Sequence, residues 1–148
     1  MGDIYNEVER SKLMSKISGK ETKPEVTVRK YLYSKGFRYF KNVNSLPGKP
    51  DIVLQKYLVV LFINGCFWHG HNCKYGKLPE TNRTFWEGKI MQTIERDHRN
   101  MNELQNLGWK VIIVWECELR NETIRSTRLI KLENQILSSS NLDRILWI

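Results

Sequence analysis

A cluster of cysteines and histidines constrains this chain more than any other feature of its sequence. Residues 66–73 read CFWHGHNC, so two thiols and two imidazoles fall within eight positions. A third cysteine follows an apolar segment much later in the chain. The best donors for a closed, structural Cys₃His zinc site are Cys66, His71, Cys73 and Cys117. Such a site would tie an irregular loop to the end of a strand; the simpler alternative is reduced, buried cysteines without metal.

The hydrophobic pattern predicts an α/β fold, in which helices pack on a mixed central sheet. Residues 51–54 and 57–63 are strong strand candidates, and the short join between them predicts antiparallel pairing. Residues 109–116 are almost continuously apolar, which predicts a central strand covered on both faces. A further short strand is expected at 37–40. The predicted helices span residues 7–18, 22–36, 84–107 and 122–137.

Composition narrows the possible classes of protein. The 148 residues correspond to a single domain, and 41% of them are hydrophobic, too many for a disordered basic tail. Lysine and arginine exceed aspartate and glutamate by 24 to 16, so the net charge of +8 favours a polyanionic partner, nucleic acid first and an anionic membrane second. The longest apolar run is too short to span a bilayer, and no signal-peptide core is present. Three cysteines fit a reduced cytoplasm better than a disulfide framework.

Two acids could form a second metal site. Asp51 opens a strand and Glu25 lies early in the preceding helix, so with a polar residue at the end of the next strand they could hold Mg²⁺ against a phosphodiester. Each also has a simpler interpretation: Glu25 as the last residue of a capping box that begins at Thr22, and Asp51 as a turn residue. Asp97 is by default a solvated helical acid.

The zinc assignment leaves Phe67, Trp68 and His69 without a role. The two aromatic rings could cap the core, which is the commoner fate of such residues. On a basic protein they could instead wedge between nucleic-acid bases. Spacing alone does not separate these alternatives.

Several segments resemble the very-short-patch mismatch-repair endonuclease (Vsr) family. The resemblance covers about residues 8–120. The segments that match are LPGKPDIV (46–53), FINGCFWHGHNC (62–73), FWEGK (85–89), ERD (95–97), GWKVIIVWECELR (108–120) and, in an N-terminal helix, RSKLMSKI (10–17). The resemblance implies a restriction-endonuclease-like fold. It also implies a DNA nickase that cuts 5′ to the thymine of a T:G mismatch, the product of 5-methylcytosine deamination. We therefore expect a nucleoid-associated bacterial enzyme of the cytoplasm, linked to a cytosine-5 DNA methyltransferase and to mismatch-repair proteins. A monomer is expected because the sequence shows no strong heptad or interface signature.

The resemblance also assigns catalytic roles by position. Asp51 and the backbone carbonyl of Ile63 would bind the catalytic Mg²⁺, and Glu25 would order water on that ion. His69 would act as general base at the scissile phosphate, oriented by Asp97.

The zinc ligands of the family match the four donors chosen above on chemistry. Phe67, Trp68 and Trp86 match aromatic residues that enter the DNA stack from one groove, and Met14 matches a residue that enters from the other. Within the single domain, residues 1–20 are thus expected to contact DNA, whereas the helix and tail at 121–148 lie outside the likeness.

One position departs from the family pattern. The acid-x-Lys motif usual in this nuclease fold is replaced by Phe62-Ile63-Asn64, and the family commonly has histidine at the position of Asn64. Asparagine can hydrogen-bond a water or a phosphate, but it cannot donate a proton at neutral pH as histidine can. We therefore expect water on the metal to protonate the leaving oxygen.

Two other functions fit parts of this pattern. A zinc-stabilised DNA-binding module without catalysis would share the charge, the thiols and the aromatic residues. A restriction-type nuclease would use the same fold to cut both strands of matched DNA.

Overall fold

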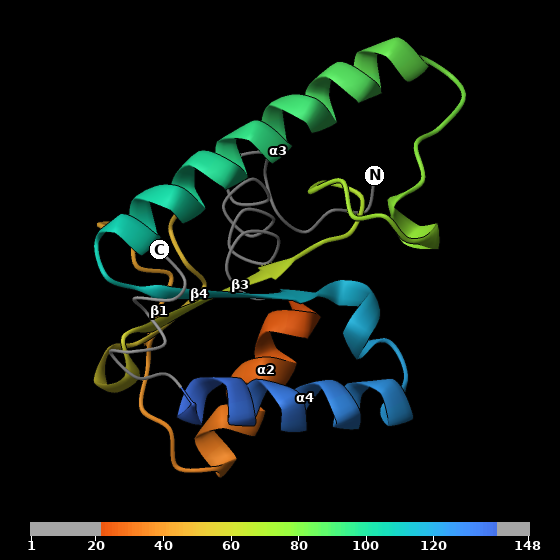
Figure 1. Ribbon diagram of the computed structural model, residues 1–148. Coiled ribbons are helices and arrows are strands. Elements are labelled where there is room, and N and C mark those ends of the chain that lie inside the picture. Colours follow the sequence, from red (N-terminus) through yellow and green to blue (C-terminus); the bar gives the residue numbers. More distant parts are fainter. Residues whose placement is uncertain (1–21, 139–148) are drawn as a thin grey trace, which may run out of the picture.

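The computed structural model describes residues 22–138 as three layers, with a sheet between helices (Figure 1). Helix α3 (Arg83–Asn106) covers one face of the sheet, and helices α2 (Lys23–Ser34) and α4 (Glu122–Leu137) cover the other. This arrangement confirms the predicted α/β class. The helix expected at residues 7–18, with Met14, lies outside the described residues, as does the end of the C-terminal tail.

The described sheet has four strands in the order β1-β2-β3-β4. Strands β1 (Phe40–Lys41), β2 (Ile52–Leu54) and β3 (Val59–Asn64) pair antiparallel, and β4 (Lys110–Trp115) pairs parallel to β3. The predicted antiparallel pairing of the two apolar segments is confirmed. Their connection is a short 3-10 helix, Gln55–Tyr57, and Leu58 completes it with a φ of 54°.

Two strand predictions were wrong in detail. Among residues 22–138, β4 pairs only with β3, so it is an edge strand and β3 is the more central one. Both faces of β4 are nevertheless covered by helices, which explains its nearly continuous apolar sequence. The strand expected at 37–40 begins only at Phe40, because Phe37 is buried in the core against Tyr57.

Two apolar cores hold the layers together. The larger joins the sheet to α2 and α4, and its fully buried members include Val28, Leu32, Leu61 and Leu132. Burying each such side chain stabilises the fold by about 1.5–3 kcal/mol. The smaller core, on the α3 side, contains Val53, Val60 and Leu104.

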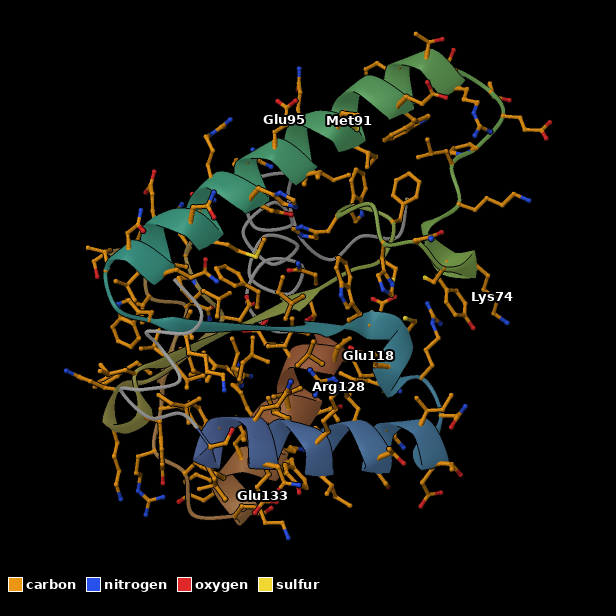
Figure 2. The ribbon with its side chains drawn as sticks, in the orientation of Figure 1. Lys74, Met91, Glu95, Glu118, Arg128 and Glu133 are labelled. Carbon is orange, nitrogen blue, oxygen red and sulfur yellow. The ribbon has the colours of Figure 1, made fainter. Side chains whose placement is uncertain are left out.

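Helix α3 is only partly anchored by these cores. Leu104, near its C-terminal end, is fully buried against the sheet, and Ile90 is buried nearer its N-terminus. Leu107, the C-cap residue just after the helix, is 63% exposed. Met91 and Glu95 lie on the side of α3 that faces away from the sheet (Figure 2).

A buried arginine connects α4 to the edge strand. Arg128 donates to the carbonyl of Ile113 at 3.2 Å and pairs with Glu118 at 3.2 Å. Figure 2 shows the Arg128 and Glu118 side chains in the space between α4 and the chain that follows β4. Glu118 in turn accepts from the backbone N–H of Trp115 at 2.8 Å. Glu118, in the turn that carries Cys117, is therefore held both by Arg128 of α4 and by the backbone at the end of β4.

Strand register sets the position of the site. In the parallel pair, Asn64 lies beside Trp115, so β3 and β4 end together. The loop after β3 and the 3-10 turn Glu116–Leu119 after β4 consequently start from the same end of the sheet. No helix of residues 22–138 is long and apolar enough to cross a membrane.

Candidate catalytic cavity and metal centre

A cavity of about 550 Å³ opens where β3 ends. Six of the residues selected from the sequence line it, namely Glu25, Asp51, Ile63, Asn64, Trp68 and His69. They come from α2, from the residue before β2, from β3 and from the loop after it. Tertiary structure therefore brings together two acids that lie 26 positions apart in the sequence.

Asp51 is held against the end of β3. Its Oδ2 accepts a hydrogen bond from the backbone N–H of Ile63 at 2.7 Å, and its own N–H donates to the carbonyl of Leu61 at 3.0 Å. Burial raises the pKa of Asp51, against the lowering effects of the Ile63 N–H and of the nearby His69 and Arg29. A desolvated carboxylate of this kind gains from a cation beside it.

Glu25 does not form the capping box that its spacing suggested. Thr22 is the N-cap of α2, but its side chain makes no capping hydrogen bond. The Glu25 side chain is instead buried, with Oε1 3.4 Å from Arg29 Nη1 one turn further along, and it lines the cavity. Because the first turn of α2 packs beside the sheet end, this carboxylate belongs to the cavity rather than to the helix cap.

His69, which lines the cavity, forms a close pair with Asp97, which does not line it. The Nδ1 atom of His69 lies 2.6 Å from Oδ2 of Asp97, which comes from the middle of α3. With the proton on Nδ1 donated to this carboxylate, Nε2 carries the lone pair. Asp97 is half-buried, so the alternative of a fully solvated helical acid is wrong.

Asn64 ends β3 and is buried, 6% exposed. It lines the main cavity and also a smaller one of about 60 Å³, which His69 and Asp97 line as well. The residue that replaces the usual lysine of the nuclease motif therefore shares the main cavity with His69 and the smaller one with both members of the histidine pair.

The four predicted soft donors converge. The ligand atoms of Cys66, His71, Cys73 and Cys117 all lie within 4.8 Å of one another. His71 Nδ1 is 3.5 Å from the sulfur of Cys117, and the His71 ring stacks on Trp115 with centroids 4.0 Å apart.

The chemistry of this donor set fits a metal ion. Burial raises the pKa of Cys117 to about 12, and Cys66 and Cys73 act in the same direction. The pKa of Cys66 is also raised by burial, whereas hydrogen bonds lower that of Cys73. A cation at the centre of the cluster would compensate the charge of the ionised thiols. The alternative of reduced, buried cysteines without metal is disfavoured, because the donors cluster and only Cys66 of the three is fully buried.

Three aromatic rings gather beside the cavity. The centroids of Phe67 and Trp68 are 5.0 Å apart, those of Phe67 and Trp86 5.3 Å, and those of Trp68 and Trp86 5.8 Å. Trp68 is 54% exposed, and none of the three belongs to either apolar core. Phe67 and Trp86 are half-buried. Geometry therefore favours a partly exposed aromatic surface over the core-capping alternative.

Comparison of the sequence with known proteins identifies the family of the chain. A family model described as DNA mismatch endonuclease Vsr matches residues 2–75. The type II nicking enzyme V.NmeAIP of Neisseria meningitidis is 54% identical over 136 residues, which cover 92% of this chain and 97% of the relative. The DNA mismatch endonuclease Vsr of Escherichia coli K12 is 43% identical over 120 residues, which cover 81% of this chain and 77% of the relative.

The chain belongs to the Vsr family. This result confirms the resemblance seen in the sequence and makes the protein a DNA endonuclease of the mismatch-repair class. A purely DNA-binding role for the cavity is correspondingly disfavoured.

Other residues of this Vsr-family site were missed in the sequence. Phe85 is 61% exposed and its ring lies 5.2 Å from that of Trp86, so it extends the aromatic surface. Lys49 and Glu116 line the cavity. The signals were present, since Phe85 sits beside Trp86 in FWEGK, Lys49 lies two positions before Asp51, and Glu116 precedes Cys117.

Proposed function

We propose that this chain nicks one DNA strand on the 5′ side of the thymine in a T:G mismatch. The observation that carries the proposal is a single cavity lined by Asp51, Glu25 and His69, in which Asp97 holds the His69 ring and the exposed Trp68 ring lies at the wall. The relative from E. coli is itself named a DNA mismatch endonuclease. Because such mismatches arise from deaminated 5-methylcytosine, we also propose a functional link to a cytosine-5 methyltransferase and to mismatch-repair proteins.

Two kinds of metal fit the chain in different places. The carboxylate of Asp51 and the carbonyl oxygen of Ile63 are hard donors suited to Mg²⁺, which when bound would stabilise negative charge on the phosphate. The Cys₃His cluster is suited to Zn²⁺ in a closed, structural role. Zinc–sulfur bonds of about 2.3 Å in a tetrahedron separate ligands by about 3.8 Å, which agrees with donor atoms within 4.8 Å of one another.

The catalytic side chains then have distinct roles. His69 removes a proton from the attacking water through Nε2, while Asp97 orients the ring through Nδ1 and stabilises the imidazolium that forms. Glu25 orders water in the cavity, and Asn64 hydrogen-bonds the phosphate or a water.

The aromatic residues open the substrate. Phe67, Trp68 and Trp86 insert into the base stack from one side, and Met14 is proposed to enter from the other. Unstacking a base step costs a few kcal/mol, and a mismatched pair is easier to open than a matched one. The wedge thereby couples recognition of the mismatch to the placement of the scissile phosphate in the cavity.

A nicking assay tests this function. Duplexes that carry T:G, T:A or C:G at one position are incubated with the enzyme and Mg²⁺, or with EDTA under conditions that retain zinc. We expect a single nick, only in the T:G duplex and only with Mg²⁺. Asp51→Ala should abolish nicking but keep mismatch binding. Binding of T:G without any cleavage would support a DNA-binding module, and cleavage of both strands in matched duplexes would support a restriction-type nuclease.

A further inference from the structure

A second, basic groove lies beside the catalytic cavity. It has a volume of about 300 Å³, and Pro24 and Glu116 line both spaces. Its charged lining residues are Lys23, Arg120, Arg125 and Glu116. Three cations therefore face one carboxylate, and none of the three has a role in the catalytic cavity.

Arg120 is positioned before any ligand arrives. Its Nη2 donates to Glu116 Oε1 at 2.9 Å, and its guanidinium lies 3.6 Å from the ring centroid of Tyr75. A guanidinium held by a stack and an ion pair loses little freedom when it binds an anion.

The metal centre accounts for this positioning. Tyr75 follows Cys73 by two residues, in the 3-10 turn Lys74–Gly76, and the turn Glu116–Leu119 contains Cys117. Two segments that share the Cys₃His cluster thus supply the two partners that hold Arg120. The cluster orders the groove as well as the loop of His69.

The other two cations come from different elements. Arg125, in the second turn of α4, is half-buried and donates to the Leu119 carbonyl at 3.1 Å. Lys23 is the exposed first residue of α2, two positions before Glu25. Three elements therefore direct positive charge into a groove that joins the cavity of Asp51.

We infer that this groove binds a backbone phosphate of the nicked strand, next to the one that is cut. The inference rests on the proposed nicking function. Successive phosphates of a strand advance by about 3.4 Å along the helix axis, so a strand with its scissile phosphate at Asp51 carries its neighbours into adjoining space. Guanidinium groups match phosphate oxygens in a two-pronged geometry. Such contacts position the duplex without reading its sequence.

Salt-dependent binding tests the groove. Arg120→Gln and Lys23→Gln are compared with wild type on T:G and C:G duplexes without Mg²⁺, by fluorescence anisotropy across a salt series. Losing one phosphate contact lowers the slope of log K against log salt by about 0.9, which is about 8-fold in affinity at 0.1 M salt. We expect that loss for each variant, equal on both duplexes. Lys131→Gln, an exposed residue of α4 outside the groove, is the matched control and should leave both quantities unchanged.

A neutral methylphosphonate in the substrate identifies the phosphate. Placed at the contacted position beside the cut, it should weaken wild-type binding and remove the difference between wild type and Arg120→Gln. The inference would be overturned if both groove variants showed the salt slope of wild type. It would also be overturned if wild type and Arg120→Gln still differed in affinity whichever phosphate flanking the cut was replaced by a methylphosphonate. If wild type still nicks T:G duplexes when one of these two results is found, the proposed nicking function stands and only the phosphate-binding role of the groove is rejected. Absence of any nicking by wild type would reject the function itself.

Discussion

Gly70 offers the sharpest test of how the loop of the site is held. It lies between His69 and His71, with a φ of 67°, in the left-handed region that favours glycine. A β-carbon there would lie 2.6 Å from Cδ1 of Ile94 and 2.9 Å from Cγ2 of Ile90. The end of Ile94 can rotate away, but the branched Ile90 is buried and rigid at χ1. Gly70→Ala therefore adds both backbone strain and a clash with α3.

The size of the effect follows from these two contributions. A left-handed conformation costs a non-glycine residue about 1–2 kcal/mol, and overpacking costs about 1–3 kcal/mol, so the sum is about 2–5 kcal/mol. With an unfolding entropy of about 2.1 cal/mol/K per residue, 148 residues give about 0.3 kcal/mol/K. Each kcal/mol then lowers Tm by about 3 °C, and Gly70→Ala by about 6–15 °C.

Two other glycines are matched controls. Gly36 has a φ of 87° but nothing within 4 Å of an added β-carbon, so Gly36→Ala should lower Tm by about 3–6 °C through backbone strain alone. Gly88 lies within α3, also in open space and without positive φ, so Gly88→Ala should raise Tm by up to about 3 °C.

Calorimetry and the T:G nicking assay read out the series. Because a shift of about 1 Å at a catalytic group can cost about 100-fold in rate, Gly70→Ala should also lose most nicking at temperatures where it is folded. Gly36→Ala should retain it. Equal Tm losses in Gly70→Ala and Gly36→Ala would refute the packing of this loop against α3.

Three further outcomes are expected. Trp68→Ala should reduce the preference for T:G over T:A more than it weakens nonspecific binding in competition assays; equal losses would argue against the wedge. Since burial raises the pKa of Asp51, its ionisation destabilises the fold as pH rises through that pKa, so without Mg²⁺ Asp51→Asn should exceed wild type in Tm at pH 7, by a margin that shrinks toward pH 4. Single-turnover nicking should be lost in His69→Ala but retained at a reduced rate in Asn64→Ala, because only His69 is assigned as general base; equal losses in the two variants would contradict the assigned roles.

Local sequence was sufficient for the elements and for the metal donors. Short apolar runs identified the hairpin strands, and apolar residues at helical spacing identified α3, because these patterns report which parts of an element are buried. The donors in the Cys66–Cys73 segment could be recognised without knowing how the strands pair, because three of them lie within eight positions of the sequence. Cys117 could be added because its chemistry has few other uses in such a chain.

Other features depended on contacts between distant segments. The apolar sequence of β4 reports two covered faces, and it is the same for a central strand and an edge strand, so pairing had to come from the structure. Glu25 had equally good spacing for a cap and for the cavity, and only the packing of α2 against the sheet end separates them.

The His69–Asp97 pair shows the same division. His69 and Asp97 are 28 positions apart, and their 2.6 Å contact exists because α3 crosses the loop that begins at the end of β3. Sequence by itself determined which donors and acids this protein possesses, because side-chain chemistry is local. Tertiary structure decided which of them meet, because strand register and helix packing set distances that no spacing along the chain encodes.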